Sequence, residues 1–419
     1  MKTKGWVKMK AECGAPIWVN YDKTKKSAAI SALVLAGGCD EKWPKQAGIA
    51  HAMEHMVFQG TQHFAGSEAL TRRIESCGGS LNAFTSYELT YFYSVLPVKL
   101  AERGFIHLRE MLLLPSIEPK NVKTEMKNII QEIKRSDNNP DEVAEQAFMK
   151  AVYGKHPFAN PVIGIKESVN NFRREDFLKW KEDMYYPENF TFIITGGLEP
   201  GKAKDLIDKM FNISPTGKSP NIRNFSVDLV GNTPRFLFVP RNDWQQSLIF
   251  MGTTIGAGDS SETLVLDFFT DMLNGMSGPL FQEVRDKRGL AYSVRSQTYN
   301  SLKLLSPIMI YAGTDPSKCE EVAKIVRMVI DKSKNSKSLF KATMKKVEWL
   351  LDIQRDSLSP IRIANSAAYD IIVYGHPVTF ENLKKRIRSI TIDQIEAAVN
   401  KYLNPDRLTT VVVGPEPKK

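Results

Sequence analysis

Cysteine is scarce in this sequence, and the few cysteines present are far apart. The 419 residues include four cysteines, and no two of them form a C-x-x-C pair: Cys13, Cys39, Cys77 and Cys319. Such isolated cysteines argue against a disulfide framework and are typical of free thiols in a reducing compartment. We therefore expect a cytoplasmic protein.

Long apolar runs are also lacking. No stretch approaches the roughly 20 residues that a helix needs to cross a bilayer, so we expect no membrane-spanning segment. Met1–Trp6 contains lysines, but no apolar segment follows it, and we expect no secretory signal. The composition, 42% hydrophobic and 25% charged, is that of a globular protein. A chain of this length is too long for one core and predicts two domains of about 200 residues each.

Acidic residues are fewer than basic ones, and the formal net charge is +10. An excess of this sign is one feature of nucleic-acid-binding proteins. The densest basic runs, Lys23–Lys26 and Lys384–Arg388, are however short and are not accompanied by aromatic residues that would stack on bases. A solvated basic surface is the better interpretation, and we expect no nucleic-acid partner.

Histidine is rare as well, yet two of the six histidines lie in the segment HAMEH that begins at His51. On a helix, His51, Glu54 and His55 share one face. They are the only polar side chains in residues 47–58, and a helix that is otherwise apolar should be buried. Burial without partners would cost roughly 2–7 kcal/mol for each polar group, a penalty that a metal ion removes. A lone buried histidine is usually just hydrogen-bonded, but this spacing favours a metal site.

A third metal ligand should come from another buried helix face, because catalytic zinc usually has three protein ligands and a water. Residues 121–136 offer such a face, with apolar residues at helical spacing: Val122, Met126, Ile129, Ile130 and Ile133. Glu125 and Glu132 lie within this stripe, where a carboxylate needs a cation. The spacing leaves open which glutamate binds the metal, and an exposed position is the alternative for either.

The order His51-x-x-Glu54-His55 is the inverted zinc motif. The surrounding residues 48–61 and the segment GGSLNAFT at residues 78–85 extend the match. With these features the chain resembles the pitrilysin-type zinc metallopeptidases, specifically the short bacterial relatives of the mitochondrial processing peptidase. The resemblance covers nearly the whole chain.

The resemblance implies a set of roles for these side chains. His51, His55 and Glu132 would hold one Zn²⁺ per chain and leave a position for water, whose pKa zinc can lower to about 7. Glu54 would act as general base on that water and pass the proton to the leaving amine. Glu125 would be a second essential glutamate that orients a ligand or tunes the site.

The sequence also contains an internal repeat. AVYGKHP at residues 151–157 is followed by a strand-like run at 186–196, and IVYGHP at residues 372–377 is followed by a similar run at 403–414. A repeat of this period indicates duplicated domains.

The duplication predicts two homologous domains, residues 1–214 and 222–419, joined by a turn-rich linker at 215–221. Strand-like runs lie between helices longer than ten residues. We therefore predict an α+β fold in which each domain is a largely antiparallel sheet backed by helices.

The second half has no histidine at the place that corresponds to the metal helix, residues 263–272, so one zinc per chain follows. Further on, the residues themselves predict only a helix that ends at Gly289. The resemblance implies more: Arg285 would hold substrate backbone, and Tyr292 would hydrogen-bond the scissile carbonyl oxygen.

The resemblance also implies a role for the segment that contains Asn82, Ala83 and Phe84, because in the family this segment forms an exposed edge of the sheet. There a substrate peptide would add as a strand. A turn is the alternative for Asn82.

Together these features predict a zinc endopeptidase for peptides or unfolded segments. In the long single-chain relatives a zinc domain faces an arginine/tyrosine domain, and this chain has one of each. We therefore predict a homodimer that encloses a chamber, in which the first domain of one subunit faces the second domain of the other. The alternatives are a catalytically silent subunit, which the intact His51, Glu54, His55 and Glu132 disfavour, and an obligate half of a heterodimer. The presence of both Arg285 and Tyr292 disfavours the latter.

Overall fold

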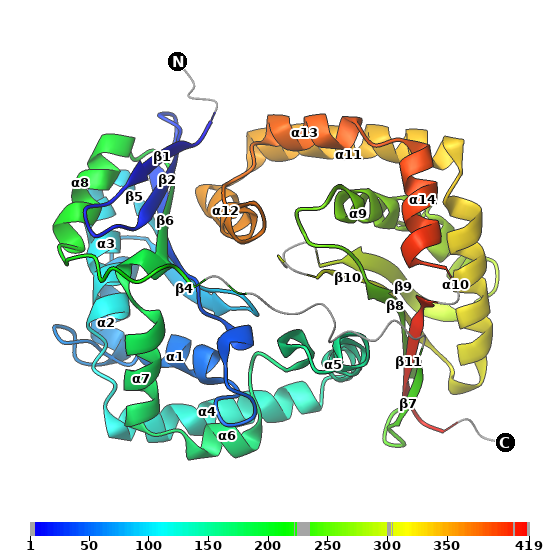
Figure 1. Cartoon of the computed structure of the whole chain (residues 1–419), viewed down its shortest axis with the longest axis horizontal. Coiled ribbons are helices and arrows are strands. Elements are labelled where there is room, and N and C mark those ends of the chain that lie inside the picture. The colour runs from blue at the N-terminus through cyan, green and yellow to red at the C-terminus, as the bar shows by residue number, and fades with distance from the viewer. Residues whose placement is uncertain are drawn as a thin grey trace. The chain divides into compact units, whose positions relative to one another are not determined.

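The structure is a computed structural model and describes residues 5–221, 223, 235–299, 303, 305–404 and 407–416. The chain forms two compact units, and neither is one continuous stretch (Figure 1). Unit 1 comprises Met1–Arg135, Asn160–Asn224 and Ser357–Thr379; unit 2 comprises Ser136–Ala159, Phe225–Asp356 and Phe380–Lys419.

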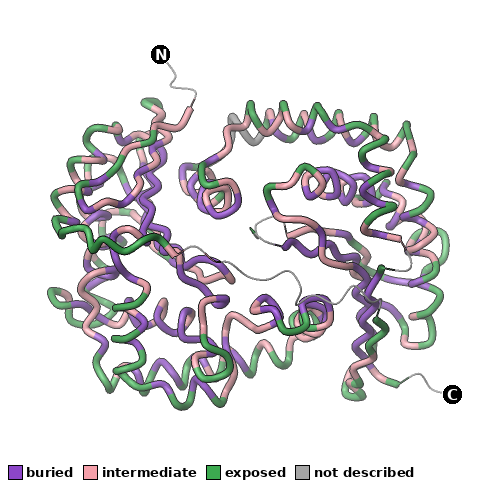
Figure 2. The backbone as a smooth tube through the Cα atoms, in the orientation of Figure 1, coloured by how far each residue is buried: buried purple, intermediate pink, exposed green. Residues whose placement is uncertain are grey.

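Unit 1 is built on a six-stranded sheet in the order β1-β2-β6-β3-β5-β4. Neighbouring strands are antiparallel except β2 and β6, which are parallel. The strands are β1 (Val7–Lys10), β2 (Pro16–Tyr21), β3 (Ser27–Val34), β4 (Ser80–Thr85), β5 (Thr90–Pro97) and β6 (Phe190–Gly196). All seven residues of β6 are buried, as Figure 2 shows for the centre of the sheet.

Helices cover both faces of this sheet. Successive residues of a strand point to opposite faces of the sheet. In β3, Ile30 and Ala32 lie in the main hydrophobic core on one face. Ala29 and Leu33 lie in a second hydrophobic cluster on the other face. The main core lies under α1 (Ile49–Val57), α2 (Gly66–Glu75), α3 (Ala101–Leu113), α4 (Pro119–Asp137), α7 (Arg174–Met184) and α8 (Pro200–Met210), with the short α6 (Lys166–Asn171) nearby. The second cluster lies under α12 (Pro360–Tyr374).

Unit 2 repeats this plan with five described strands in the order β7-β11-β8-β10-β9. Only β7 and β11 are parallel. The strands are β7 (Phe236–Pro240), β8 (Ser247–Thr254), β9 (Ala291–Thr298), β10 (Pro307–Thr314) and β11 (Thr409–Gly414). Its helices are α5 (Pro140–Tyr153), α9 (Ser261–Leu273), α10 (Cys319–Ser333), α11 (Lys337–Ser357), α13 (Phe380–Arg388) and α14 (Ile392–Tyr402). The prediction of two largely antiparallel, helix-backed sheets is confirmed.

One helix of each sequence half packs in the unit formed mainly by the other half. α5 lies on β8 and β11 of unit 2, where the rings of Phe148 and Phe250 are 5.9 Å apart. α12 lies on β3 and β6 of unit 1, where Thr195 Oγ1 donates to the Pro360 carbonyl. The domains at 1–214 and 222–419 were predicted from the sequence duplication and stay a prediction. The compact units have different bounds, because α5 belongs to unit 2 and α12 to unit 1.

No helix within the described part of the chain is both long and apolar enough to cross a membrane.

Candidate metal centre

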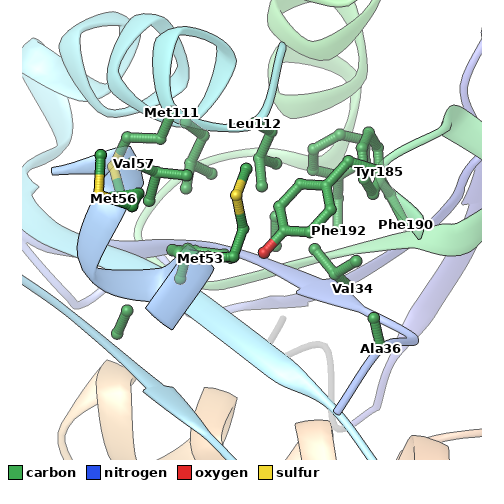
Figure 3. Packing of buried hydrophobic residues seen from close by; sticks show 14 of the residues in the cluster. Val34, Ala36, Met53, Met56, Val57, Met111, Leu112, Tyr185, Phe190 and Phe192 are labelled. Atoms are coloured by element: carbon green, nitrogen blue, oxygen red, sulfur yellow. The ribbon is translucent and has the colours of Figure 1, made fainter. Parts of the chain in front are cut away.

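Helix α1, Ile49–Val57, carries the HAMEH segment, which was predicted to be helical. Its apolar side packs into the core of unit 1: Figure 3 shows Met53 beside Leu112 and Tyr185, with Met56 near Met111. The opposite side presents His51, Glu54 and His55, all partly buried. The apolar residues of α1 therefore fix which way the three polar side chains face.

The two histidines meet Glu132 of α4. Their Nε2 atoms lie 3.9 Å (His51) and 3.7 Å (His55) from Glu132 Oε2. One ligand atom from each of the three residues lies within 4.8 Å of the others. Tetrahedral zinc with bonds of about 2.0–2.1 Å places its ligand atoms roughly 3.3 Å apart, so closing the site needs only small side-chain movements.

Glu125 approaches the same centre from behind His55. His55 Nδ1 donates to Glu125 Oε2 at 3.4 Å, and Asn128 Nδ2 donates to Glu125 Oε1 at 3.1 Å. In neutral His55 with its proton on Nδ1, this hydrogen bond leaves the Nε2 lone pair facing Glu132. The two glutamates that spacing left open thus lie in different places: Glu132 lies near Nε2 of both histidines, and Glu125 lies against Nδ1 of His55.

The protonation of the histidines suits a metal. Burial, together with the neighbouring His55, lowers the pKa of His51 to about 3, so its ring is neutral at pH 7. For His55, burial acts to lower the pKa, but the hydrogen bond to Glu125 and the nearby carboxylates outweigh it and raise the pKa. A cation at the centre would replace the proton that these carboxylates attract.

Glu54 stands beside the three candidate ligands and is held by the end of β4. Thr85 Oγ1 donates to Glu54 Oε2 at 2.6 Å. Burial raises the pKa of Glu54, while the Thr85 hydrogen bond and the charge of His55 act to lower it. The carboxyl of Glu54 is therefore poised closer to neutral pH than an exposed glutamate, which suits proton transfer.

Strand β4 contains Asn82, Ala83 and Phe84 and lies at the edge of the sheet. Among the described residues β4 pairs only with β5, so its other edge has backbone groups open to a further strand. Asn82 is exposed and lies within the strand rather than in a turn. Ala83 is buried in the main core, and the Phe84 ring stacks on Tyr369 of α12 at 5.8 Å.

Arg285 and Tyr292 lie together in unit 2. The Arg285 guanidinium carbon is 4.4 Å from the centre of the Tyr292 ring, and Nη1 donates to the Tyr292 carbonyl at 2.9 Å. Tyr292 is the second residue of β9, the last strand in the described order of this sheet, and is 75% exposed. A π-helical turn, Phe281–Asp286, precedes it, and Gly289 follows that turn with φ +57°, which agrees with the predicted helix end.

Thr85 and Asn128 were not predicted from the sequence. Asn128 is one helical turn from Glu125, so periodicity offered a signal. Thr85 lies 31 residues from Glu54, and only the fold brings them together.

Two protein-family models match most of the chain. Residues 17–166 match the model of insulinase (peptidase family M16), and residues 171–346 match that of the peptidase M16 inactive domain. The chain belongs to peptidase family M16. The resemblance drawn from the HAMEH segment and its surroundings is thereby confirmed.

M16 relatives carry zinc protease names. An "uncharacterized zinc protease" of Rickettsia bellii is 26% identical over 395 residues, covering 93% of this chain and 92% of that protein. The "uncharacterized zinc protease YmxG" of Bacillus subtilis is 27% identical over 321 residues, 75% of each. A crystal structure of a protease from Helicobacter pylori superposes with a TM-score of 0.89 at 19% identity, covering 98% of this chain and 100% of that one. These names support a metallopeptidase at the level of the M16 family.

The candidate metal ligands His51, His55 and Glu132 all lie within the residues matched to the insulinase model. The helix of the second half, α9, has no histidine, and it lies within the residues matched to the inactive domain. Two imidazoles and one carboxylate are a donor set that fits Zn²⁺. Within the described residues, His51, His55 and Glu132 are the group identified as able to hold a metal ion.

Proposed function

We propose that this chain is a zinc-dependent endopeptidase that cleaves peptides or unfolded polypeptide segments. The observation that carries the proposal is that Glu132 of α4 lies close to His51 and His55 of α1, with Glu54 on the same face of α1 as the histidines. These residues are those expected for three ligands and one general base.

His51, His55 and Glu132 would hold Zn²⁺, which when bound acidifies a water and polarises a carbonyl oxygen. Glu125 keeps the Nδ1 proton on His55 and so directs Nε2 to the centre. Glu54 accepts a proton from the attacking water and delivers it to the leaving amine. Thr85 holds one oxygen of Glu54, which leaves the other for the water.

The substrate peptide would bind as an added strand along β4. Main-chain hydrogen bonds of this kind recognise an extended backbone with little regard to side chains. The phenol of Tyr292 would donate to the carbonyl oxygen as it becomes an oxyanion, and Arg285 would hold peptide backbone. A donor of this type is typically worth about 3–4 kcal/mol of barrier.

We further propose that the active form is a homodimer. The proposal is supported by the presence of both the candidate metal ligands and the Arg285–Tyr292 pair in one chain. A chain with only one of these would need a different partner.

Removal of the metal tests the proposed chemistry. Dialysis of the purified chain against a strong chelator should abolish cleavage of an unfolded protein substrate, and one equivalent of Zn²⁺ should restore it. Glu132→Gln should bind zinc more weakly and lose turnover, because an amide oxygen is a poorer zinc ligand than a carboxylate. Cleavage that survives chelation would refute a metallopeptidase.

A further inference from the structure

The first turn of α1 is capped by a side chain from a different segment. The residue at the cap position is Gly48, which has no side chain to accept the free N–H groups of the helix. Glu41 supplies both oxygens instead: Gly48 N donates to Oε2 at 2.8 Å, and Ala50 N donates to Oε1 at 3.0 Å. Burial raises the pKa of the Glu41 carboxyl to about 8, while its hydrogen bonds from Gly48 N and Ala50 N act to lower it. The helix dipole also favours the ionised form at this end of a helix.

The same turn is held from the other side by backbone contacts. Gly48 has φ +89°, and a Cβ there would lie 2.6 Å from the Ile163 carbonyl oxygen. A Cβ on Gly164 would lie 2.4 Å from the Ala47 carbonyl oxygen. The same carbonyl oxygen accepts a hydrogen bond from Ser168 Oγ at 2.6 Å. The start of α1 is therefore fixed between Glu41 and residues 163–168.

The two histidines on α1 are supported differently. His55 is held through Nδ1 by Glu125. The Nδ1 atom of His51 is buried and has no hydrogen-bond partner among the residues that the structure describes. The direction of the His51 ring must therefore follow the backbone of the first helical turn and its packing.

His51 directly follows Ala50, whose N–H is bound by Glu41. From this juxtaposition we infer that Glu41 is a positioning residue for the metal centre: by fixing the first turn of α1, it aims His51 at Glu132 and so raises zinc affinity. The inference rests on the proposed zinc function, and it assigns to Glu41 the supporting part that Glu125 has toward His55.

Zinc affinity of the full chain, measured by competition with a chromophoric chelator, tests this role. Glu41→Gln keeps one acceptor oxygen but turns an amide group toward the second N–H, and loss of such support typically costs 10–100-fold in metal affinity. We expect a loss in that range, with an intermediate loss for Glu41→Asp, which keeps the carboxyl group but is one methylene shorter.

Asp40→Asn is the matched control. Asp40 is also a buried carboxylate, but it binds Gly37 N and Arg223 rather than α1. The control should lower thermal stability and leave zinc affinity within about twofold of the parent. Binding of Co²⁺ adds a second readout: its visible absorption reports ligand geometry, and we expect a changed spectrum for Glu41→Gln and the parental spectrum for Asp40→Asn.

The outcomes separate the inference from the proposed function. Failure of the parent chain to bind one zinc would refute the proposed function. A parent that binds zinc, with Glu41→Gln equal to it in affinity and Co²⁺ spectrum, would overturn the role of Glu41 alone. Equal losses in Glu41→Gln and Asp40→Asn, both verified as folded by circular dichroism, would also overturn it, because the effect would then be general destabilisation.

Discussion

Thr85→Val should make Glu54 a base that ionises at higher pH. The valine side chain has nearly the shape of threonine but cannot donate, so the 2.6 Å hydrogen bond to Glu54 Oε2 is lost. That bond favours the ionised carboxylate, and it opposes the burial that raises the pKa of Glu54. Removing it therefore raises the pKa further.

The size of the shift follows from the kind of bond that is lost. A hydrogen bond to a charged group is worth about 1.5–3 kcal/mol, and one pKa unit corresponds to about 1.4 kcal/mol, which gives a shift of about 1–2 units. Glu54 is only partly buried, so water replaces some of the lost interaction. We expect the lower end, a shift of about one unit.

The assay is the pH profile of kcat/KM for a quenched fluorescent peptide, with zinc content matched between variants. Because Glu54 must be ionised to accept a proton, the acidic limb of the profile should move up by about one pH unit in Thr85→Val. Well below the limb, activity should fall about tenfold. Thr85→Ser keeps the hydroxyl and should keep the parental limb. An acidic limb that stays in place or moves to lower pH in Thr85→Val would refute the reasoning.

Three further predictions concern other parts of the molecule. Burial lowers the pKa of His107 to about 4, below its unfolded value of about 6.5, so its neutral form stabilises the fold above pH 6.5 and this contribution is lost as the pH falls. Between pH 7 and pH 4.5, the free energy of unfolding in urea should fall by roughly 2–3 kcal/mol less in His107→Leu than in the parent. Equal falls in the two proteins would contradict a contribution from His107. Tyr292→Phe should reduce kcat by about 10²–10³ with little change in KM in steady-state kinetics, and an unchanged kcat would remove its phenol from the reaction. Tyr369→Leu removes the ring stacked on Phe84 and should lower stability in urea by at least about 0.5–1.5 kcal/mol, whereas Tyr369→Phe keeps the ring and should match the parent; equal stabilities of the Leu and Phe variants would argue against the stack.

Helical periodicity was sufficient to predict the two faces of the metal centre. The helix predicted around His51 and His55 is α1, and the apolar stripe that includes Glu125 is the buried side of α4. Periodicity places residues on a face but does not give the distance to another helix, which is why the roles of Glu125 and Glu132 stayed open until the family resemblance was considered. In the structure Glu125 Oε2 lies 3.4 Å from His55 Nδ1, and Glu132 Oε2 lies 3.7 Å from His55 Nε2.

Contacts between distant segments could not be predicted in this way. Glu41 caps a helix that begins eight residues later, and the chain between them has no periodic pattern that marks the pair. The exchange of α5 and α12 was equally hidden, because an apolar helix face such as that of Ala364, Ala367 and Ala368 fits either of two similar sheets. A sequence repeat shows that a domain is duplicated and not which copy receives each helix.

The central claim is that Glu54 acts as the base at a zinc centre to which it is not itself a ligand. The most direct measurement is zinc content, together with turnover of an unfolded protein substrate, for the purified parent chain and for Glu54→Gln. We predict one zinc per chain in both proteins and turnover only in the parent. Loss of zinc in Glu54→Gln, or turnover retained by it, would contradict the account.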